Sequence, residues 1–182
     1  MPLPDHLAPR QPIHRRTITI EGFRREDGLF DVEGRLTDVK YFDVPLADEV
    51  RRAGEPVHDM KIRITLDENL NVVDACAATD AMPYRDACDK ITPDYAKLRG
   101  HRIAPGFRNL LAELFGGLRG CTHLTELLGS IAPAAVQSLY HQPRTQPKDP
   151  NKKPFQLDGC HALDTRGPVV AKFYPRWFRA KG

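Results

Sequence analysis

The residues best suited to chemistry in this sequence lie together between Gly120 and Glu126. Cys121 offers a thiol, His123 an imidazole and Glu126 a carboxylate, directly after three closely spaced glycines. The leucines and isoleucine at 124, 127, 128 and 131 recur every three or four residues, which predicts a helix with one apolar stripe. The dipole and free N–H groups at the start of such a helix favour a thiolate. We therefore expect chemistry at this helix start.

A metal site is the first hypothesis, because a second cysteine and histidine are adjacent further along the chain. Thiolate and imidazole ligands select zinc, copper or iron over magnesium or calcium. The predicted ligands for zinc or iron are Cys121, His123, His58, Cys160 and His161. Three of them with water or a carboxylate would make an open catalytic site, whereas four would be structural. The alternative is that these thiols and imidazoles are ordinary buried or hydrogen-bonded groups.

A nucleophilic cysteine is the second interpretation of the same residues. Cys121 would need a base, and residues two apart in a helix point in different directions. His123 is then a poor partner, so that His161 or His58 would have to supply the base from elsewhere in the fold.

A metal-free lyase or hydrolase is the alternative enzyme. It would use Asp59, Asp80, Tyr84 and His123 as acid–base groups around an apolar pocket. With Cys121, these residues are the predicted catalytic set. The competing interpretation is that Asp59 caps a turn and that Asp80 belongs to a surface ion pair.

The segments that must position these groups predict an α+β fold. Residues 17–23 and 29–41 alternate as strands around Asp27-Gly28, a type I′ hairpin signal, with Gly34 as a bulge. The polar residues of this hairpin, Asp38 among them, are read as a solvated face. Residues 60–66 and 70–78 form a second hairpin. We expect about four antiparallel strands from two hairpins, packed by C-terminal helices.

The helical segments come later in the chain. Residues 107–114 have helical spacing, and Pro133 either kinks the helix that follows Cys121 or opens another over 133–140. A short helix is expected around 47–52, and a short strand over 169–174.

The domain organisation follows from composition. Residues 1–13 are a proline-rich extended arm, 14–141 the α+β domain, 142–154 a loop or linker, and 155–182 a segment that packs back on the domain. The aromatic residues Trp177 and Phe178 cover the core or a partner subunit. A non-enzymatic binding or assembly module is thus the third hypothesis.

The composition excludes several classes. No apolar run approaches the roughly 18 residues that span a bilayer, and the N-terminus lacks the apolar stretch of a signal peptide, so a cytoplasmic protein is expected. Four widely spaced cysteines then indicate reduced thiols. A net charge of +3 without a basic aromatic motif argues against nucleic acid. The expected partner is a small-molecule ligand, and no binding to nucleic acid or to a membrane is expected. The sequence is also compatible with a homo-oligomer.

Several motifs together resemble a bacterial family, the domain of unknown function number twenty-eight eighty-nine. They are Glu21-Gly22-Phe23, Asp27-Gly28-Leu29-Phe30-Asp31-Val32-Glu33-Gly34, Asp38, His58-Asp59-Met60, Arg63, Gly120-Cys121-Thr122-His123-Leu124, Glu126-Leu127, Cys160-His161-Ala162-Leu163 and Tyr174-Pro175-Arg176-Trp177. The resemblance covers residues 14 to 178 and implies no activity.

A second resemblance is to iron–sulfur scaffold proteins of the NifU type. His58 to Ile64 entering a hairpin, the return over 71–75 and a later Gly-Cys before a helix are similar in order. His58 stands where a scaffold cysteine would be expected, and the glycine–cysteine segment after the second strand is missing. This resemblance implies an α+β layout and a metal-binding bias. Together these observations favour a small-molecule enzyme or binding protein with a Cys/His site, its enzymatic status left open.

Overall fold

The computed structural model describes residues 3–5, 7–139, 151–154 and 156–180. They belong to two compact units, Met1–Arg144 and Thr145–Gly182, and each is described by itself.

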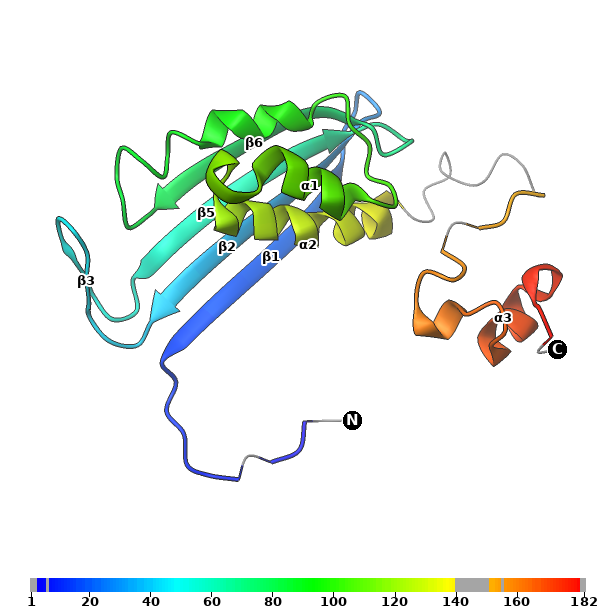
Figure 1. Cartoon of the computed structure of the whole chain (residues 1–182), viewed down its shortest axis with the longest axis horizontal. Coiled ribbons are helices and arrows are strands. Elements are labelled where there is room, and N and C mark those ends of the chain that lie inside the picture. The colour runs from blue at the N-terminus through cyan, green and yellow to red at the C-terminus, as the bar shows by residue number, and fades with distance from the viewer. Residues whose placement is uncertain (1–2, 6, 140–150, 155, 181–182) are drawn as a thin grey trace. The chain divides into compact units, whose positions relative to one another are not determined.

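The first unit is built on a four-stranded antiparallel sheet (Figure 1). Its strands are β1 (His14–Arg24), β2 (Phe30–Lys40), β5 (Pro56–Leu66) and β6 (Val72–Ala81), in the order β1-β2-β5-β6. Each strand pairs with its neighbour antiparallel over nearly its whole length. The predicted α+β fold with two hairpins is confirmed.

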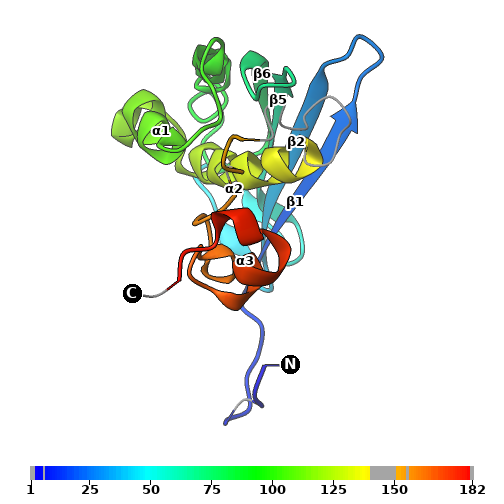
Figure 2. The same ribbon diagram turned by 90° about the vertical axis from the view of Figure 1, so that its right-hand side faces the viewer.

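Helices cover one face of this sheet (Figures 1 and 2). They are the 3-10 helix η1 (Thr92–Leu98), α1 (Phe107–Phe115) and α2 (Thr122–Leu139); a 3-10 turn η2 (Gly117–Arg119) joins the last two. Side chains alternate between the faces of a strand, and the even-numbered residues from 30 to 36 in β2 and from 60 to 66 in β5 are buried. The core of the sheet consists of Phe30, Val32, Leu36, Met60, Ile62, Ile64 and Leu66. The predicted apolar stripe of α2 packs on them, from Leu124 to Leu139.

The opposite face of the sheet is polar. Side chains on this face pair across the strands, as in the ion pairs of Arg35 with Asp59 and of Lys61 with Asp80. Such pairs on an exposed sheet face contribute modestly to stability. Because the helices cover only the apolar face of the sheet, the first unit consists of two layers, sheet and helices, with one apolar interface between them.

Gly34 lets α2 approach the sheet closely. It stays in regular register with Ile20 and Ile62, so the predicted bulge there is wrong. A Cβ at Gly34 would lie 2.7 Å from Cδ1 of Ile131 on α2. The register shift between β2 and β5 falls instead between Asp38 and Val39.

Two other local predictions need correction, and one of the two alternatives for Pro133 is excluded. The first hairpin closes through a loop over 25–29, longer than a two-residue type I′ turn, and Gly28 has a φ of +88°. In place of the helix expected around 47–52, the two short strands β3 (Val44–Pro45) and β4 (Val50–Arg51) pair. Pro133 does not open a second helix over 133–140; it lies inside α2, which continues through it to Leu139.

The second unit is small and is organised around a few buried residues. Leu157, Thr165 and Val170 are buried, and the carboxylate of Asp158 accepts two hydrogen bonds from Thr165. Residues 168–173 form the short helix α3 (Pro168–Phe173), so the strand predicted there is wrong; Pro168 occupies the first turn, where proline is tolerated. The single turns η3 (His161–Leu163) and η4 (Pro175–Trp177) flank it.

Most of the predicted linker, residues 142–150, lies outside the described residues, and the packing of 155–182 on the domain stays a prediction. Within the described part of the chain, every helix is too short or too polar to cross a membrane.

Candidate metal centre

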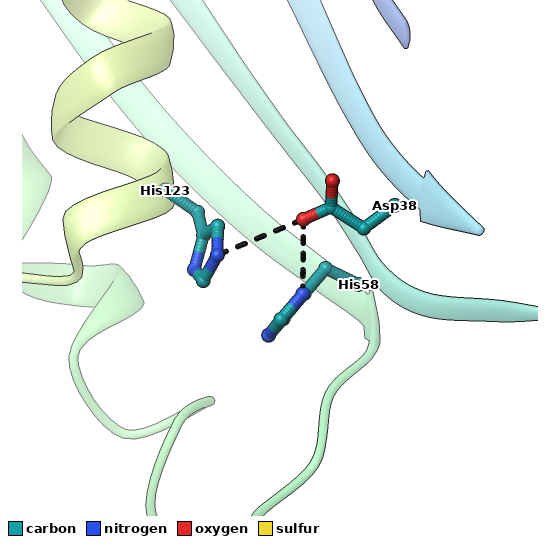
Figure 3. Close-up of side chains that lie close together, drawn as sticks. All are labelled: Asp38, His58 and His123. Carbon is teal, nitrogen blue, oxygen red and sulfur yellow. Dashed lines mark hydrogen bonds and ion pairs between the residues drawn. The ribbon is translucent and has the colours of Figure 1, made fainter. Parts of the chain in front are cut away.

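Three side chains that can hold a metal ion converge at one end of the sheet (Figure 3). Asp38 comes from the end of β2, His58 from the start of β5 and His123 from the first turn of α2. One ligand atom from each lies within 4.8 Å of the others. Asp38 Oδ2 is 3.1 Å from His58 Nδ1 and 3.7 Å from His123 Nε2. The two imidazole rings are 3.9 Å apart between centroids.

The strand register places two of the three. Asp38 and His58 are directly paired across β2 and β5. Both have even numbers and therefore share the face that carries Leu36 and Met60 toward the helices. The apolar stripe of α2 lies over that face, so its first turn brings His123 above the pair (Figure 3).

Asp38 is held by β1 as well. Its side chain is buried, 5% exposed, and accepts hydrogen bonds from Arg16 Nε at 2.8 Å and Arg16 Nη2 at 2.7 Å. His14 Nε2 lies 2.8 Å from the same carboxylate, on Oδ1. Burial alone would raise the pKa of Asp38, but the hydrogen bonds from Arg16 and His14 outweigh it and hold that pKa well below its usual range. Asp38 is thus an anion at neutral pH.

Arg16 also reaches the helix. Its Nη1 donates to Glu126 Oε2 at 2.5 Å, one turn along α2 from His123. Arg16 therefore connects the edge strand β1 with β2, which carries Asp38, and with α2, which carries His123.

Both site histidines favour the neutral form. Burial, followed by the neighbouring His123 ring, lowers the pKa of His58 despite the opposing effect of Asp38. Burial and the charge of Arg16 lower the pKa of His123. Neutral imidazole is the form that binds metals.

Cys121 lies beside this centre. It precedes the first residue of α2, and its carbonyl accepts the N–H of Thr125 at 2.9 Å. Its Sγ is 3.9 Å from His123 Nδ1, so the two side chains meet although they are two residues apart. The expectation that they diverge assumes that both are inside the helix, whereas the backbone before Thr122 is not helical. The buried Tyr95 hydroxyl fixes this turn, because it accepts the Cys121 N–H at 2.9 Å and donates to the Cys121 carbonyl at 3.0 Å.

The metal-free set is not brought together. His58 and Asp59 are neighbours in β5 and point to opposite faces, and Asp59 pairs with Arg35 on the polar face. Asp80 pairs with Lys61 on that face as well. Tyr84 is 64% exposed in the loop after β6. A surface hollow near this loop involves none of them; its lining is Leu46, Asp48, Glu49, Met82, Pro83 and Arg85.

Of the predicted ligands, the structure brings together His58 and His123 with Cys121 beside them. Cys160 and His161 belong to the second unit, where both are exposed. Their convergence with Cys121 and His123 stays a prediction.

The candidate ligand that sequence reasoning misses is Asp38, which the sequence pattern predicts on a solvated face. The signal was its position: Phe30, Val32, Leu36 and Asp38 fall on the same face of one strand, and a carboxylate on an otherwise apolar, inward face needs partners. Those partners, His14 and Arg16, occupy the corresponding even positions of β1.

A family model described as "Protein of unknown function (DUF2889)" matches residues 14–137. The matched range contains Asp38, His58, Cys121 and His123 and ends before Cys160. No curated protein and no solved structure matches the chain. The resemblance to NifU-type scaffold proteins stays a prediction.

Proposed function

The chain belongs to the DUF2889 family, and we propose that it binds a divalent transition-metal ion, zinc or iron(II), through Asp38, His58 and His123, for chemistry on a small molecule. The observation that carries the proposal is the convergence of these three donor groups from β2, β5 and α2.

The spacing of the donors supports this function. Ligand atoms bound about 2.1 Å from one ion at angles of 90–110° lie roughly 3.0–3.5 Å apart. The separations of 3.1 and 3.7 Å from Asp38 Oδ2 need changes of only a few tenths of an ångström. The third separation, between the nitrogens of the two imidazoles, shortens when the side chains rotate, and both have room to do so because they are partly exposed: His58 by 16% and His123 by 22%.

The surroundings of the ligands support it as well. Arg16 and His14 fix the Asp38 carboxylate, and hydrogen bonds of this kind typically set the orientation of ligands in metal sites. The negative charge on Asp38 and the neutral imidazoles are the protonation states that a divalent ion requires.

The donor set indicates an open site. Two histidines and one carboxylate are the ligands of non-haem iron(II) centres and of several catalytic zinc sites, which keep positions for water or substrate. Bound there, zinc would lower the pKa of a water molecule, and iron(II) would offer positions for oxygen and substrate. The chain's own part is to hold the ligands rigidly on sheet and helix.

Metal content of protein purified without a histidine tag tests the proposal. We expect close to one equivalent of zinc or iron, removed by a chelator and restored by one equivalent of Zn²⁺ or Co²⁺. The Co²⁺ form should show visible d–d absorption, which Asp38→Asn, His58→Ala and His123→Ala each abolish. Less than a tenth of an equivalent, with no binding of added Co²⁺, refutes it.

Matched controls separate ligation from loss of structure. Asp59→Asn removes a carboxylate that is equally buried and equally paired with an arginine, but on the polar face. His101→Gln removes a partly buried histidine outside the centre. Both should retain the Co²⁺ spectrum. Cys160→Ser and His161→Ala, measured in the same way, test the predicted contribution of those residues.

One observation favours a metal-free acid–base centre as the second candidate. His58 Nδ1 lies 3.1 Å from an Asp38 carboxylate anchored by Arg16, and such a pair orients the other imidazole nitrogen as a general base. Activity that survives complete removal of metal but not His58→Gln would favour this candidate over the first.

A further inference from the structure

The thiol of Cys121 lies between the His123 ring and a second sulfur atom, that of Met60. Cys121 Sγ lies 3.9 Å from His123 Nδ1 and 3.7 Å from Met60 Sδ. Thiolate, thioether and imidazole are the donors that select Cu(I). We propose that Cys121, Met60 and His123 form a second metal position, specific for Cu(I), distinct from the divalent site.

The two separations measured from Cys121 Sγ match those of a three-coordinate ion. With bonds of about 2.3 Å to sulfur and about 2.0 Å to nitrogen, a trigonal arrangement sets two sulfurs about 4.0 Å apart and sulfur and nitrogen about 3.7 Å apart. The observed separations of 3.7 and 3.9 Å differ from these values by a few tenths of an ångström.

The charge and burial of this position also favour a monovalent ion. Met60 is 1% exposed, and apolar core side chains surround it. Cu(I) bound to the Cys121 thiolate is neutral overall, whereas a divalent ion would leave an uncompensated charge in an apolar environment. Cys121 is half-buried, so an ion can reach the thiolate from solvent.

Tyr95 makes the position rigid. Its hydroxyl hydrogen-bonds both the N–H and the carbonyl of Cys121, and its ring stacks on Phe115 at 4.5 Å between centroids. The thiol is thus presented from a fixed backbone, and little ordering is needed when an ion binds.

The two metal positions share His123 through different nitrogens. Nε2 faces Asp38 and Nδ1 faces Cys121. A neutral imidazole carries a hydrogen on one nitrogen and offers a lone pair on the other. Cu(I) and a divalent ion therefore compete for the ring, and loading one weakens the other.

Anaerobic titration of the full-length apo-protein with Cu(I) tests the inference, with bicinchoninate as the competing ligand. We expect one equivalent to be withdrawn from bicinchoninate, with thiolate-to-copper absorption in the near ultraviolet. Cys121→Ser should abolish this binding, and Met60→Leu, which nearly conserves volume, should weaken it at least tenfold. The triple variant Cys76→Ser, Cys88→Ser, Cys160→Ser, which removes the remaining cysteines, should bind as the wild type does.

Two results overturn the inference: no withdrawal of Cu(I) by the wild type, or withdrawal unchanged in Cys121→Ser or in Met60→Leu. Far-ultraviolet circular dichroism verifies that each variant is folded, and Met60→Leu keeps the test decisive if Cys121→Ser unfolds. Zn²⁺ binding is measured separately. Zn²⁺ bound without Cu(I) refutes only this inference, whereas Cu(I) bound by a protein that binds none of Zn²⁺, Fe²⁺ and Co²⁺ refutes only the divalent site. In protein that binds both, Cu(I) should release Zn²⁺ to a chromogenic chelator.

Discussion

Removing the guanidinium of Arg16 should destabilise the first unit through Asp38. Arg16 donates two charge-assisted hydrogen bonds to this carboxylate, and removing one partner of a buried ion pair costs about 3–5 kcal/mol. The Arg16 side chain is 31% exposed, so water replaces part of the interaction. For Arg16→Met, which keeps the aliphatic stem, we therefore expect a loss of about 2–3 kcal/mol. At about 2–4 °C per kcal/mol for a protein of this size, the Tm should fall by about 4–12 °C.

Urea unfolding followed by circular dichroism at pH 7 measures this loss, with Arg35→Met as the matched variant. Arg35 makes the same two-bond contact with Asp59, at 2.8 and 2.6 Å, but its side chain is 52% exposed. Its loss should be nearer 1 kcal/mol.

The pH dependence provides a second measurement on the same variant. The pKa of Asp38 is held well below that of the unfolded chain, about 3.9. Its contribution is thus complete above about pH 5 and declines as the pH falls toward the folded value. The stability difference between wild type and Arg16→Met should shrink over that range. A difference below about 0.5 kcal/mol at pH 7, or one that stays constant down to pH 3, would refute this account of Asp38.

Three further predictions test the packing and the site. Gly34→Ala should destabilise the protein by about 1–3 kcal/mol, because the new methyl group overlaps side chains of α2. Gly129 lies inside α2, and a methyl group there meets nothing within 4 Å, so Gly129→Ala should stabilise the protein by up to about 1 kcal/mol. Denaturant titration compares the two variants. Tyr95→Phe should cost about 1–3 kcal/mol, because a buried N–H at the start of α2 loses its acceptor; equal urea midpoints would contradict this. Since the pKa values of His58 and His123 are lowered, Zn²⁺ binding should persist below pH 6.5 and disappear only as the pH falls through those lowered values; calorimetric titration from pH 7.5 to 5 measures it.

The strands and the apolar stripe of α2 could be predicted because their signals are local. The strand over 60–66 buries one face, so its apolar residues alternate with polar ones. The helix after Cys121 also buries one face, so its apolar residues recur every three or four positions. The short strand pair at residues 44–51 and the helix at 168–173 depend on weaker signals. The β-branched Val169 and Val170 favour a strand, but Pro168 at a first helical position and packing of Val170 select a helix.

The candidate site was only partly predictable, because it depends on register. His58 and His123 could be singled out as chemical residue types, but nothing local in the sequence places Asp38 opposite His58. That pairing lies between β2 and β5, and it follows from their regular register up to Asp38, without the bulge predicted at Gly34. A bulge at Gly34 would have turned Asp38 to the polar face. Likewise, the contact of Cys121 with His123 depends on the residue at which α2 begins.

The ion pair between Arg16 and Glu126 spans 110 residues of sequence. During synthesis, β1 leaves the ribosome long before α2, and the donor atoms of the divalent site cannot meet until the start of that helix has emerged. Long-range closures of this kind slow folding. A nascent chain therefore exposes Asp38 and His58 without His123, and in the proposed divalent site stable binding of a metal ion would be a late event in the maturation of the protein.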